Sequence, residues 1–495
     1  NNRRETRGGD PRVSDEFDGI VVGSGPNGLA AAVTLARAGL KVRVYERAVD
    51  AGGGARTREL TLPGFHHDTC SAVHPLAIAS PFFRAFGLAE RIDLLTPELS
   101  FAHPLSLGRS ALAYRDLDVT AAHLGRDGDA YRRLMKPLAD RALAVAEFVG
   151  SPLLPVPKRL PTAIRFGLRT AEQGSRLWNL RFREDAAPAL LTGAAAHAIL
   201  RLPSLATAGA GLALTAHAHA GGWPIPRGGS QAIPDAMIAD LRAHGGELVT
   251  GTPISSLREL PPSRLTLLDV TPRALIEMAG DDLHAGYRRQ LENFRYGNGV
   301  AKVDFALSGP VPWRDPALAE APTLHLGGTR ADITRAENAV ASGRHAKDPY
   351  VLVSQPSVLD SSRAPAGKQT LWTYTHVPAG SPVDQTEAII RRIERFAPHF
   401  RDVILASHSV TAAQMSTENP NYIGGDISSG YFGLSQLIRR PIVSTDPWAT
   451  SITGVYLCGA STAPGPGVHG LAGWYAARSA LRALGMQAPD LSPGG

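Results

Sequence analysis

Cysteine is scarce in this chain, and two other kinds of segment are missing. Only 2 of the 495 residues are cysteines, Cys70 and Cys458, which excludes a disulfide scaffold and a cysteine-rich zinc site. No run reaches the about 18 consecutive apolar residues typical of a membrane-spanning helix. The nearest approach, residues 186–220, is interrupted by Arg201 and Pro203 and predicts buried helices. No block of like charges occurs, although 51 Lys+Arg exceed 45 Asp+Glu, so we expect no nucleic-acid partner.

The composition is otherwise that of a folded protein with more than one domain. A hydrophobic content of 43% excludes wholesale disorder, and 495 residues predict two to four domains at roughly 100–200 residues each. Residues 1–16 are polar, and no apolar stretch follows Arg3-Arg4 as a twin-arginine export signal requires. We therefore expect a flexible extension at residues 1–16 and a cytoplasmic protein.

The strongest motif follows a short apolar run at residues 19–22. Gly23-Ser24-Gly25-Pro26-Asn27-Gly28 comes next, then a helix-forming run over residues 29–38 and a second strand over residues 41–45 that ends at Glu46. A strand, a glycine turn, a helix and a second strand within about thirty residues are typical of a dinucleotide-binding unit.

Each residue type in this motif has a physical task. Gly23 makes the tight turn, Gly25 lets the backbone approach a pyrophosphate, and Gly28 lets the helix pack closely on the strand. The helix N-terminus offers free N–H groups to the phosphates. Glu46 lies 18 residues beyond Gly28, where a carboxylate accepts hydrogen bonds from a ribose and disfavours the 2′-phosphate of NADP.

Two further glycine loops favour FAD over NAD. Gly52-Gly53-Gly54-Ala55-Arg56-Thr57 follows the first unit closely, and Arg56 supplies a cation for the diphosphate or the flavin. Near the other end, a strand over residues 454–458 runs into a glycine-rich loop over residues 459–470 and a helix over residues 471–484. This second strand–loop–helix meets the first only if the nucleotide domain is discontinuous, and its helix N-terminus would stabilise negative charge on a reduced flavin.

The chain resembles the phytoene desaturase and carotenoid isomerase superfamily of FAD-dependent oxidoreductases. The closer likeness is to a phytoene desaturase-like branch that includes proteins labelled pyridine nucleotide-disulfide oxidoreductase domain-containing protein 2. The motifs that carry the resemblance are Gly23–Gly28, Gly52-Gly53 with Arg56-Thr57, Gly64-Phe65-His66-His67-Asp68, Gly222–Ser230, Asn419–Asp426 and Gly467-Val468-His469-Gly470.

The resemblance implies an α/β fold with a discontinuous Rossmann-type FAD-binding domain, of the glutathione reductase-like kind, and an inserted α+β substrate domain. We expect the FAD-binding domain to comprise residues 17–75, 223–290 and 450–495. The substrate domain would then comprise residues 76–222 and 291–449.

This sequence departs from the pattern of its relatives in three places. Gly54 stands where an arginine often follows the glycine pair, which leaves Arg56 as the cation there. The connection over residues 258–264, before the strand over residues 265–269, is short. Pro466 stands where the final loop usually has glycine.

The motifs predict a set of cofactor-binding residues and two catalytic candidates. The predicted cofactor contacts are Gly23, Gly25, Pro26, Asn27, Gly28, Glu46, Arg47, Gly53, Gly54, Arg56, Thr57, Gly459, Ala460, Gly467, Val468 and His469. His469 is also a candidate proton donor or substrate contact, with a loop-holding hydrogen bond as the alternative. Tyr422 is the second catalytic candidate, and for Tyr422 and Asp426 a turn role is the alternative.

The remaining histidines and cysteines have plainer interpretations. His66, His67 and His74 flank Asp68 without the spacing of a metal site, so we expect no metal. His197, His217 and His219 are interpreted as core histidines, with the lining of a substrate cavity as the alternative. Cys458 follows apolar strand residues and is expected to be a buried, inert thiol.

The substrate half holds one further candidate feature. Residues 162–183 predict a basic, partly amphipathic helix, interpreted as a solvated helix over the core. The alternative is a lid or membrane-docking face that admits a lipophilic substrate.

We expect an FAD-dependent dehydrogenase or desaturase that moves a hydride from a small hydrophobic or polyunsaturated substrate to flavin N5. A redox-neutral isomerase that uses reduced flavin, an amine-type oxidase and a flavin-binding protein without turnover are the alternatives. The Gly23–Gly28 motif is used for FAD, so no nicotinamide domain is expected and oxygen or a quinone would take the electrons. The sequence leaves the substrate, the acceptor and the oligomeric state open.

Overall fold

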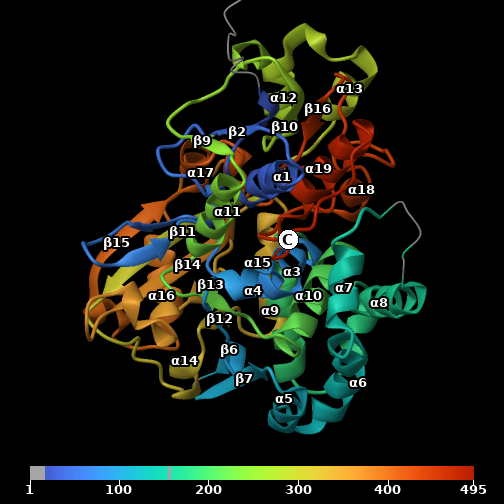
Figure 1. Cartoon of the computed structure of the whole chain (residues 1–495). Helices are drawn as coiled ribbons and strands as arrows, with labels where there is room; N and C mark the ends of the chain where they lie inside the picture. The colour runs from blue at the N-terminus through green and yellow to red at the C-terminus, as the bar shows by residue number, and fades with distance from the viewer. Residues whose placement is uncertain (1–16, 107, 154–156, 158, 495) are drawn as a thin grey trace, which may run out of the picture.

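Two β-sheets organise the chain, one at each end of the molecule (Figure 1). This computed structural model describes residues 17–494 except 107, 154–156 and 158. The flexible extension expected at residues 1–16 lies outside the described residues.

The first sheet is parallel and draws its five strands from three separate parts of the chain. Its order is β16-β10-β1-β2-β9, and every pairing is parallel. The strands are β1 (Phe17–Val22), β2 (Val42–Tyr45), β9 (Glu247–Val249), β10 (Ser263–Leu268) and β16 (Val455–Leu457). The discontinuous Rossmann-type sheet is therefore confirmed, whereas the boundaries proposed for the two domains stay a prediction.

Helices cover both faces of this sheet because successive strand residues point to opposite sides. Val21 packs with α1 (Pro26–Arg37), α11 (Ala232–Ala243) and α19 (Leu471–Ala483). Ile20, on the other face, packs with the helices that follow β10. These are α12 (Pro272–Ala279) and α13 (Ala285–Glu292).

Helix α1 begins earlier than expected, at Pro26 rather than residue 29. Gly25 is its N-cap residue and Pro26 occupies the first helical position, where a missing N–H costs nothing. Helix α19 packs closely against α1, since a Cβ at Gly473 would lie 1.7 Å from the Asn27 carbonyl oxygen. The start of α1 is thereby held between β1 and the C-terminal helix.

The second sheet has seven strands and mixed direction. Its order is β15-β11-β14-β13-β12-β6-β7, with antiparallel pairs except between β12 and β6. The strands are β6 (Leu99–Ser106), β7 (Arg109–Tyr114), β11 (Gly299–Leu307), β12 (Thr323–Leu326), β13 (Val351–Ser354), β14 (Gln369–Val377) and β15 (Ile404–Val410). Helix α16 (Thr386–Glu394) packs on one face of this sheet.

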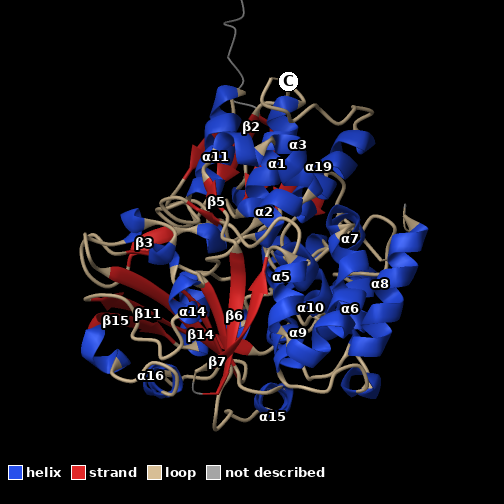
Figure 2. Cartoon of the chain, turned by 90° about the horizontal axis from the view of Figure 1, so that it is seen from below, coloured by secondary structure: helices blue, strands red, loops and turns tan. Residues whose placement is uncertain are grey.

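A group of helices lies beside the second sheet on its other face (Figure 2). They are α5 (Leu117–His123), α6 (Gly128–Ala139), α7 (Ala142–Val149), α8 (Leu160–Gln173), α9 (Ala186–Ala196) and α10 (Leu205–Ala218). Helices α9 and α10 are buried, as predicted for residues 186–220. None of the helices in the described ranges is both long and apolar enough to cross a membrane.

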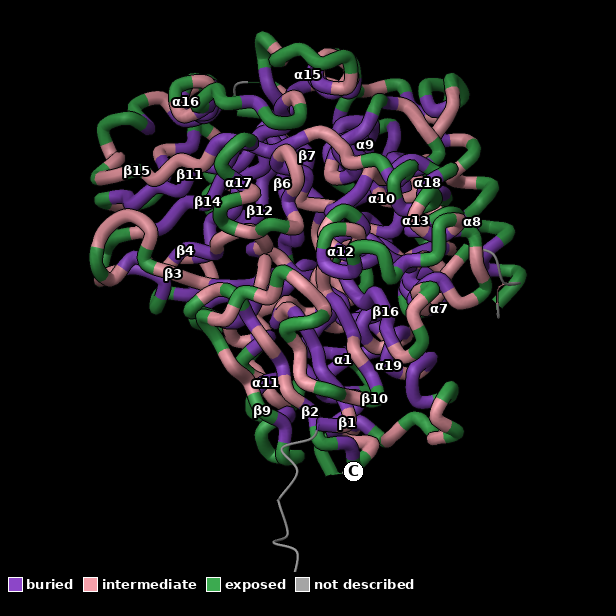
Figure 3. Tube along the Cα trace, turned by 90° about the horizontal axis from the view of Figure 1, so that it is seen from above, coloured by how far each residue is buried: buried purple, intermediate pink, exposed green. Residues whose placement is uncertain are grey.

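The prediction of one helix over residues 162–183 is wrong, because α8 ends at Gln173. A 3-10 helix, Arg176–Asn179, follows after a break. At Gly174 a Cβ would lie 2.8 Å from the Ser204 carbonyl oxygen, so the chain passes tightly against the start of α10 and turns away there. Most of the outer surface of α8 is exposed (Figure 3).

Shorter elements connect these layers. The helices are α2 (Pro75–Ala79), α3 (Pro81–Phe86), α4 (Leu88–Arg91), α14 (Ala317–Glu320), α15 (Arg330–Val340), α17 (Ala412–Glu418) and α18 (Leu434–Ile438). The strands are β3 (Thr57–Glu59) paired with β4 (His66–Asp68), and β5 (Leu94–Leu95) paired with β8 (Ile225–Pro226).

Candidate cofactor and substrate site

One large cavity connects the two sheets. It has a volume of about 1280 Å³ and runs from the loops after β1 and β2 to strands β12, β13 and β14. Single small-molecule sites occupy roughly 300–1,000 Å³. The cavity is therefore large enough for a dinucleotide and a second molecule together.

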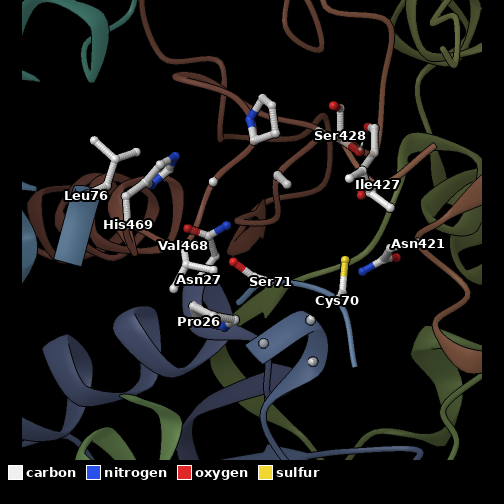
Figure 4. A pocket seen from close by; sticks show the side chains of 18 of the residues that line it. Pro26, Asn27, Cys70, Ser71, Leu76, Asn421, Ile427, Ser428, Val468 and His469 are labelled. Atoms are coloured by element: carbon white, nitrogen blue, oxygen red, sulfur yellow. Dashed lines mark hydrogen bonds between the residues drawn. The ribbon is translucent and has the colours of Figure 1, made fainter. Parts of the chain in front are cut away.

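The first glycine loop forms one wall of the cavity, and its glycines leave no room for side chains. A Cβ at Gly28 would lie 2.1 Å from the Gly23 carbonyl oxygen, and Gly23 itself has a φ of 97°. Figure 4 shows Pro26 and Asn27 at the start of α1, near Val468. The bare backbone at this point leaves room for a pyrophosphate beside the helix N-terminus.

Glu46 ties the first loop to the second strand. Its Oε2 accepts hydrogen bonds from the Ser24 backbone N–H (2.9 Å) and hydroxyl (2.6 Å), and its Oε1 accepts one from the Ala48 N–H (2.8 Å). A carboxylate has about four acceptor positions, so Glu46 keeps capacity for the ribose contact that we predict. Glu46 and the neighbouring Arg47 both line the cavity.

The second glycine loop packs backbone to backbone against the first. A Cβ at Gly53 would lie 2.7 Å from the Gly25 Cα, and the Gly52 N–H donates to the Ser24 carbonyl at 3.1 Å. A Cβ at Gly54 would lie 2.2 Å from the hydroxyl oxygen of Tyr422. The phenol of Tyr422 thus fills the space beside residue 54, so a side chain at this position would collide with it.

Arg56 and Thr57, which end the second glycine loop, have different surroundings. Arg56 lines the cavity, donates to the carbonyls of Gly53 (2.8 Å) and Glu418 (3.1 Å), and its pKa is lowered by burial. Thr57 does not line the cavity, and its hydroxyl donates to Asp68 at 2.7 Å. The structure therefore brings Arg56 to the site and gives Thr57 a supporting position.

The C-terminal loop closes the cavity opposite the first glycine loop. Ala460, Gly467, Val468 and His469 line it, whereas Gly459 lies behind the lining. The Nδ1 of His469 accepts the Leu471 N–H at 3.0 Å, so its Nε2 carries the proton and donates to the Gly465 carbonyl at 3.2 Å. Burial lowers the pKa of His469 to about 4. Both ring nitrogens are engaged within the loop itself, and a catalytic role for His469 stays a prediction.

Tyr422 and Asp426 also differ in whether they line the cavity. Tyr422 lines the cavity next to Cys70, and burial raises its pKa. Asp426 does not line the cavity, and it accepts the backbone N–H groups of Gly297, Ser428 and Gly430 at 2.6–2.9 Å. Asp426 therefore has the turn role that the sequence left as an alternative.

Asp269 is a site residue that the motifs did not reveal. It follows β10 directly, lines the cavity, and its Oδ2 accepts the Gly28 N–H at 3.1 Å. A Cβ at Gly25 would lie 2.6 Å from Oδ2, and a Cβ at Gly459 would lie 2.7 Å from Oδ1. The carboxyl group thus sits between the first and last glycine loops, and its burial raises its pKa to about 7. The signal available in the sequence was an acid at the carboxyl end of a parallel strand, where ligands bind in such sheets.

The residues present fit FAD. The glycine loops pack so closely on their neighbours that a Cβ at Gly25, Gly28 or Gly53 would collide with protein atoms, and the buried Oδ1 of Asn27, at the helix start, has no hydrogen-bond partner among the described residues. Glu46 and Arg56 supply an acceptor for a ribose and a cation for the diphosphate or the flavin. When bound, FAD supplies a hydride acceptor.

The histidines of the helical region have two kinds of environment. His219 is a core residue, with one ring nitrogen on the Tyr131 hydroxyl (2.7 Å) and the other on a backbone carbonyl. His197 lines the cavity and pairs with His325 through their Nε2 atoms at 3.0 Å. His217 also lines the cavity, and its Nε2 is buried without a partner in the described chain.

The histidines near Asp68 belong to a structural network. Asp68 pairs with Arg363 at 2.8 Å, and His74 bonds the Ser230 hydroxyl at 2.7 Å. Across residues 17–494, leaving aside those not described, no group of three or more His, Cys, Asp or Glu side chains is placed to hold a metal. Cys458 is buried, and burial raises its pKa, as the strand context predicted.

Comparison of the sequence with known proteins supports the same interpretation. Residues 21–86 match the NAD(P)-binding Rossmann-like domain. The chain is 25% identical to pyridine nucleotide-disulfide oxidoreductase domain-containing protein 2 of Mus musculus, over 97% of this chain and 96% of that protein. It is 27% identical to phytoene dehydrogenase of Streptomyces griseus, over 78% of this chain and 77% of that enzyme.

Solved structures with the same fold cover almost the whole chain. A double mutant of putrescine oxidase has a TM-score of 0.63 at 17% identity, over 95% of this chain and 99% of that one. An oxidoreductase from Methanosarcina mazei has a TM-score of 0.60 at 16% identity, over 94% and 99%. At this identity the likeness shows the fold. Together with the glycine loops, these findings confirm the resemblance to the phytoene desaturase-like flavoproteins, and the chain is an FAD-dependent oxidoreductase.

Proposed function

We propose that the protein is a dehydrogenase or desaturase that removes hydrogen from a hydrophobic substrate. The substrate would lose a hydride to flavin N5 and a proton to a base or water, leaving a double bond. The cavity would hold the reacting C–H bond next to the flavin and keep bulk water away.

The absence of charge in one part of the cavity lining carries this proposal. The charged residues that line the cavity come from the glycine-loop region and helices α12 and α17: Glu46, Arg47, Arg56, Arg58, Asp269, Glu277 and Glu418. The described lining from α7, α8, α10, α18 and strands β12 to β14 contains no Asp, Glu, Lys or Arg. A buried ion without a partner costs several kcal/mol or more, so this part of the cavity favours an uncharged, apolar molecule.

The alternatives fit this lining unequally. A carboxylate near the substrate would favour an amine-type oxidase that binds a cationic amine, and the described lining of that part offers none. An isomerase that uses reduced flavin would fit the same apolar cavity. The chain contains two G-x-G-x-x-G sequences, Gly23–Gly28 and Gly465–Gly470, and both belong to loops that line this one cavity, so neither is left for a nicotinamide cofactor. Electrons are therefore proposed to enter from the organic substrate and leave to oxygen or a quinone.

An anaerobic spectrum of the purified holoprotein tests the proposal. Addition of an acyclic polyene hydrocarbon in micelles should bleach the visible flavin band, while NADH and NADPH should leave it unchanged. Bleaching by NADH or NADPH, with isomerised polyene recovered, would establish the isomerase instead. A flavin that no polyene or amine reduces would favour the flavin-binding protein without turnover.

We further propose that the substrate enters from an anionic lipid surface that docks at α8. Leu160, Ile164 and Leu168 form a stripe on this helix with 51%, 54% and 67% exposure. Gly167 and Ala171 of the same helix are exposed and line the cavity, so α8 lies along its mouth. An exposed apolar stripe at a cavity mouth is typical of a surface that contacts a membrane.

Nearby positive charge supports an anionic surface. Arg165 and Arg176 are exposed, and neither forms an ion pair with a described residue. Vesicles that contain phosphatidylglycerol should float the wild-type protein at low salt, while the variant Ile164→Glu/Leu168→Glu should stay at the bottom of the gradient. The control Val383→Glu changes another exposed apolar residue, at 47% exposure, on a different part of the chain. Wild-type protein that does not float, or a control that behaves like the α8 variant, would overturn this docking surface.

A further inference from the structure

The cavity-facing side of the seven-stranded sheet carries two cross-strand rows of residues. In the first row, Lys302 lies opposite Tyr374, Tyr374 opposite Leu352, and Leu352 opposite His325. The second row contains Asp304, Trp372, Ser354 and Thr323 in the same strand order. Residues directly opposite on antiparallel strands have Cβ atoms about 4.5–5.5 Å apart, so each row is a continuous line of side chains.

The second row holds buried polar atoms that have no partner. The Nε1 of Trp372, the Oγ of Ser354 and the Oγ1 of Thr323 form no hydrogen bond with any described residue. These three residues are between 0% and 4% exposed. Trp372 and Thr323 line the cavity, and Ser354 lies between them in the row. Buried polar groups are normally hydrogen-bonded, so three neighbouring exceptions at a cavity wall indicate a missing ligand group.

The groups around this row carry no net charge. Lys302 and Asp304 form an ion pair with each other at the β11 end. The pKa of His197 is lowered to about 3 and that of His217 to about 4, in both cases chiefly by burial, so both imidazoles are neutral at physiological pH. A neutral wall of donors and acceptors suits an uncharged oxygen group better than a carboxylate or an ammonium group.

The opposite end of the substrate part is apolar. Leu153, Phe166, Leu205, Leu434 and Leu437 line it near α8 and α18. A molecule that spans the substrate part would therefore meet hydrocarbon at the mouth and hydrogen-bonding groups at the sheet.

We propose that the substrate is a long apolar molecule with one uncharged oxygen group, a hydroxyl or a carbonyl, which Thr323, Ser354 and Trp372 hold at the sheet. This inference deepens the proposed function, on which it rests, because it concerns the same cavity. The row would act in binding and orientation, with the apolar body of the molecule toward α8.

Calorimetric titration of the oxidised holoprotein with ligands of one chain length tests the inference. The ligands are cetyl alcohol, the corresponding methyl ketone, hexadecane, palmitate and hexadecylamine, each delivered from cyclodextrin. The alcohol and the ketone should bind about tenfold more tightly than hexadecane. Equal affinity for alcohol and alkane, or tightest binding of palmitate or the amine, would overturn the inference.

Matched variants identify the residues responsible. The double variant Thr323→Val/Ser354→Ala, and Trp372→Phe separately, should reduce the preference for alcohol over alkane to about twofold or less while hexadecane binds as before. The control Thr373→Val makes the same chemical change on the opposite face of β14, where its hydroxyl donates to the Val303 carbonyl at 2.6 Å. This control should keep the full preference.

The outcomes also separate this inference from the proposed function. Variants that keep the preference but shift the flavin spectrum would show that the row contacts the cofactor, which overturns the inference. Selective binding of the alcohol without flavin reduction by any polyene would leave the inference standing and overturn the dehydrogenase. Flavin reduction by a pure hydrocarbon, without preference for oxygenated ligands, would overturn the inference and leave the dehydrogenase standing.

Discussion

The two halves of the cavity are built from different parts of the polypeptide. The cofactor half is shaped by three glycine loops, whose close packing leaves no room for side chains at Gly28, Gly53 and Gly459. The substrate half is lined by side chains from helices α7, α8, α10 and α18 and from strands β12 to β14. Backbone walls demand glycine at fixed spacing and thus leave a motif in the sequence, whereas side-chain walls leave none.

The largest effect is expected at Gly28. Gly28→Ala places a Cβ 2.1 Å from the Gly23 carbonyl oxygen, inside the turn that faces the pyrophosphate. We expect a loss of about 3 kcal/mol in the free energy of unfolding, together with loss of bound FAD. Urea denaturation and the flavin absorbance of purified protein measure both. Gly309→Ala is the control, because nothing lies within 4 Å of its Cβ; a Gly28→Ala protein that retains FAD would contradict the backbone wall.

A smaller effect, and one that can be reversed, is expected at Gly54. Gly54→Ala collides with the Tyr422 hydroxyl at 2.2 Å, whereas the next ring atom, Cζ, is 3.5 Å away. The single variant should lose about 2 kcal/mol of stability. Tyr422→Phe removes the colliding oxygen, so the double variant should recover at least half of the loss in a double-mutant cycle. Additive losses would show that the two residues do not meet.

Asp269 should make FAD binding depend on pH. Burial raises the pKa of its carboxyl to about 7. Between about pH 4 and 7, the folded protein therefore holds a proton that the unfolded chain has released. This contribution to the free energy of unfolding falls as pH rises through that window and is constant above it.

Above pH 7 the ionised carboxylate would lie beside the site of the anionic pyrophosphate. FAD affinity should fall by about tenfold per pH unit there if only the neutral form binds. In the variant Asp269→Asn, the free energy of unfolding and the FAD affinity should both depend less on pH. This variant should also bind FAD more tightly at pH 8. Reconstitution of apoprotein with FAD at pH 6, 7 and 8 checks this. If FAD affinity changes with pH as much in the variant as in the wild-type protein, Asp269 is not the source of the pH dependence.

The smallest effect on rate is expected at His469. Both ring nitrogens hold the loop over residues 465–471, so His469→Asn should cost about 1 kcal/mol of stability. The rate of anaerobic flavin reduction should change by less than about tenfold, since loss of a general acid or base typically costs about 100-fold or more. A 100-fold loss with unchanged stability would instead make His469 the catalytic candidate that its motif suggested.

The sequence predicted those features whose causes are local. The β1–α1–β2 unit, Glu46 and the last glycine loop were found because their residues are neighbours in the chain. Asp269 was missed because its place beside Gly23 depends on the register of β1 with β10, in which Val22 pairs with Leu268. The contact of Tyr422 with Gly54 joins residues far apart in sequence and could not be read from either motif.

The helical prediction over residues 162–183 was wrong for a similar reason. Its apolar and basic pattern continues past Gln173, but close packing of Gly174 on the Ser204 carbonyl ends α8. Such a tertiary contact overrides local helix propensity. The polar row on the seven-stranded sheet was likewise invisible, because four strands contribute one residue each.

The origin of the five parallel strands in three distant stretches has a consequence for biosynthesis. Strand β16, which joins β10 at the sheet edge, and the loop that closes the cofactor cavity both come far along the chain from β1, α1 and β10. A polypeptide emerging from the ribosome thus forms its first glycine turn early and completes the nucleotide pocket only after the loop over residues 459–470 has emerged. FAD capture would await that loop, and nascent chains stalled before residue 455 should carry no flavin.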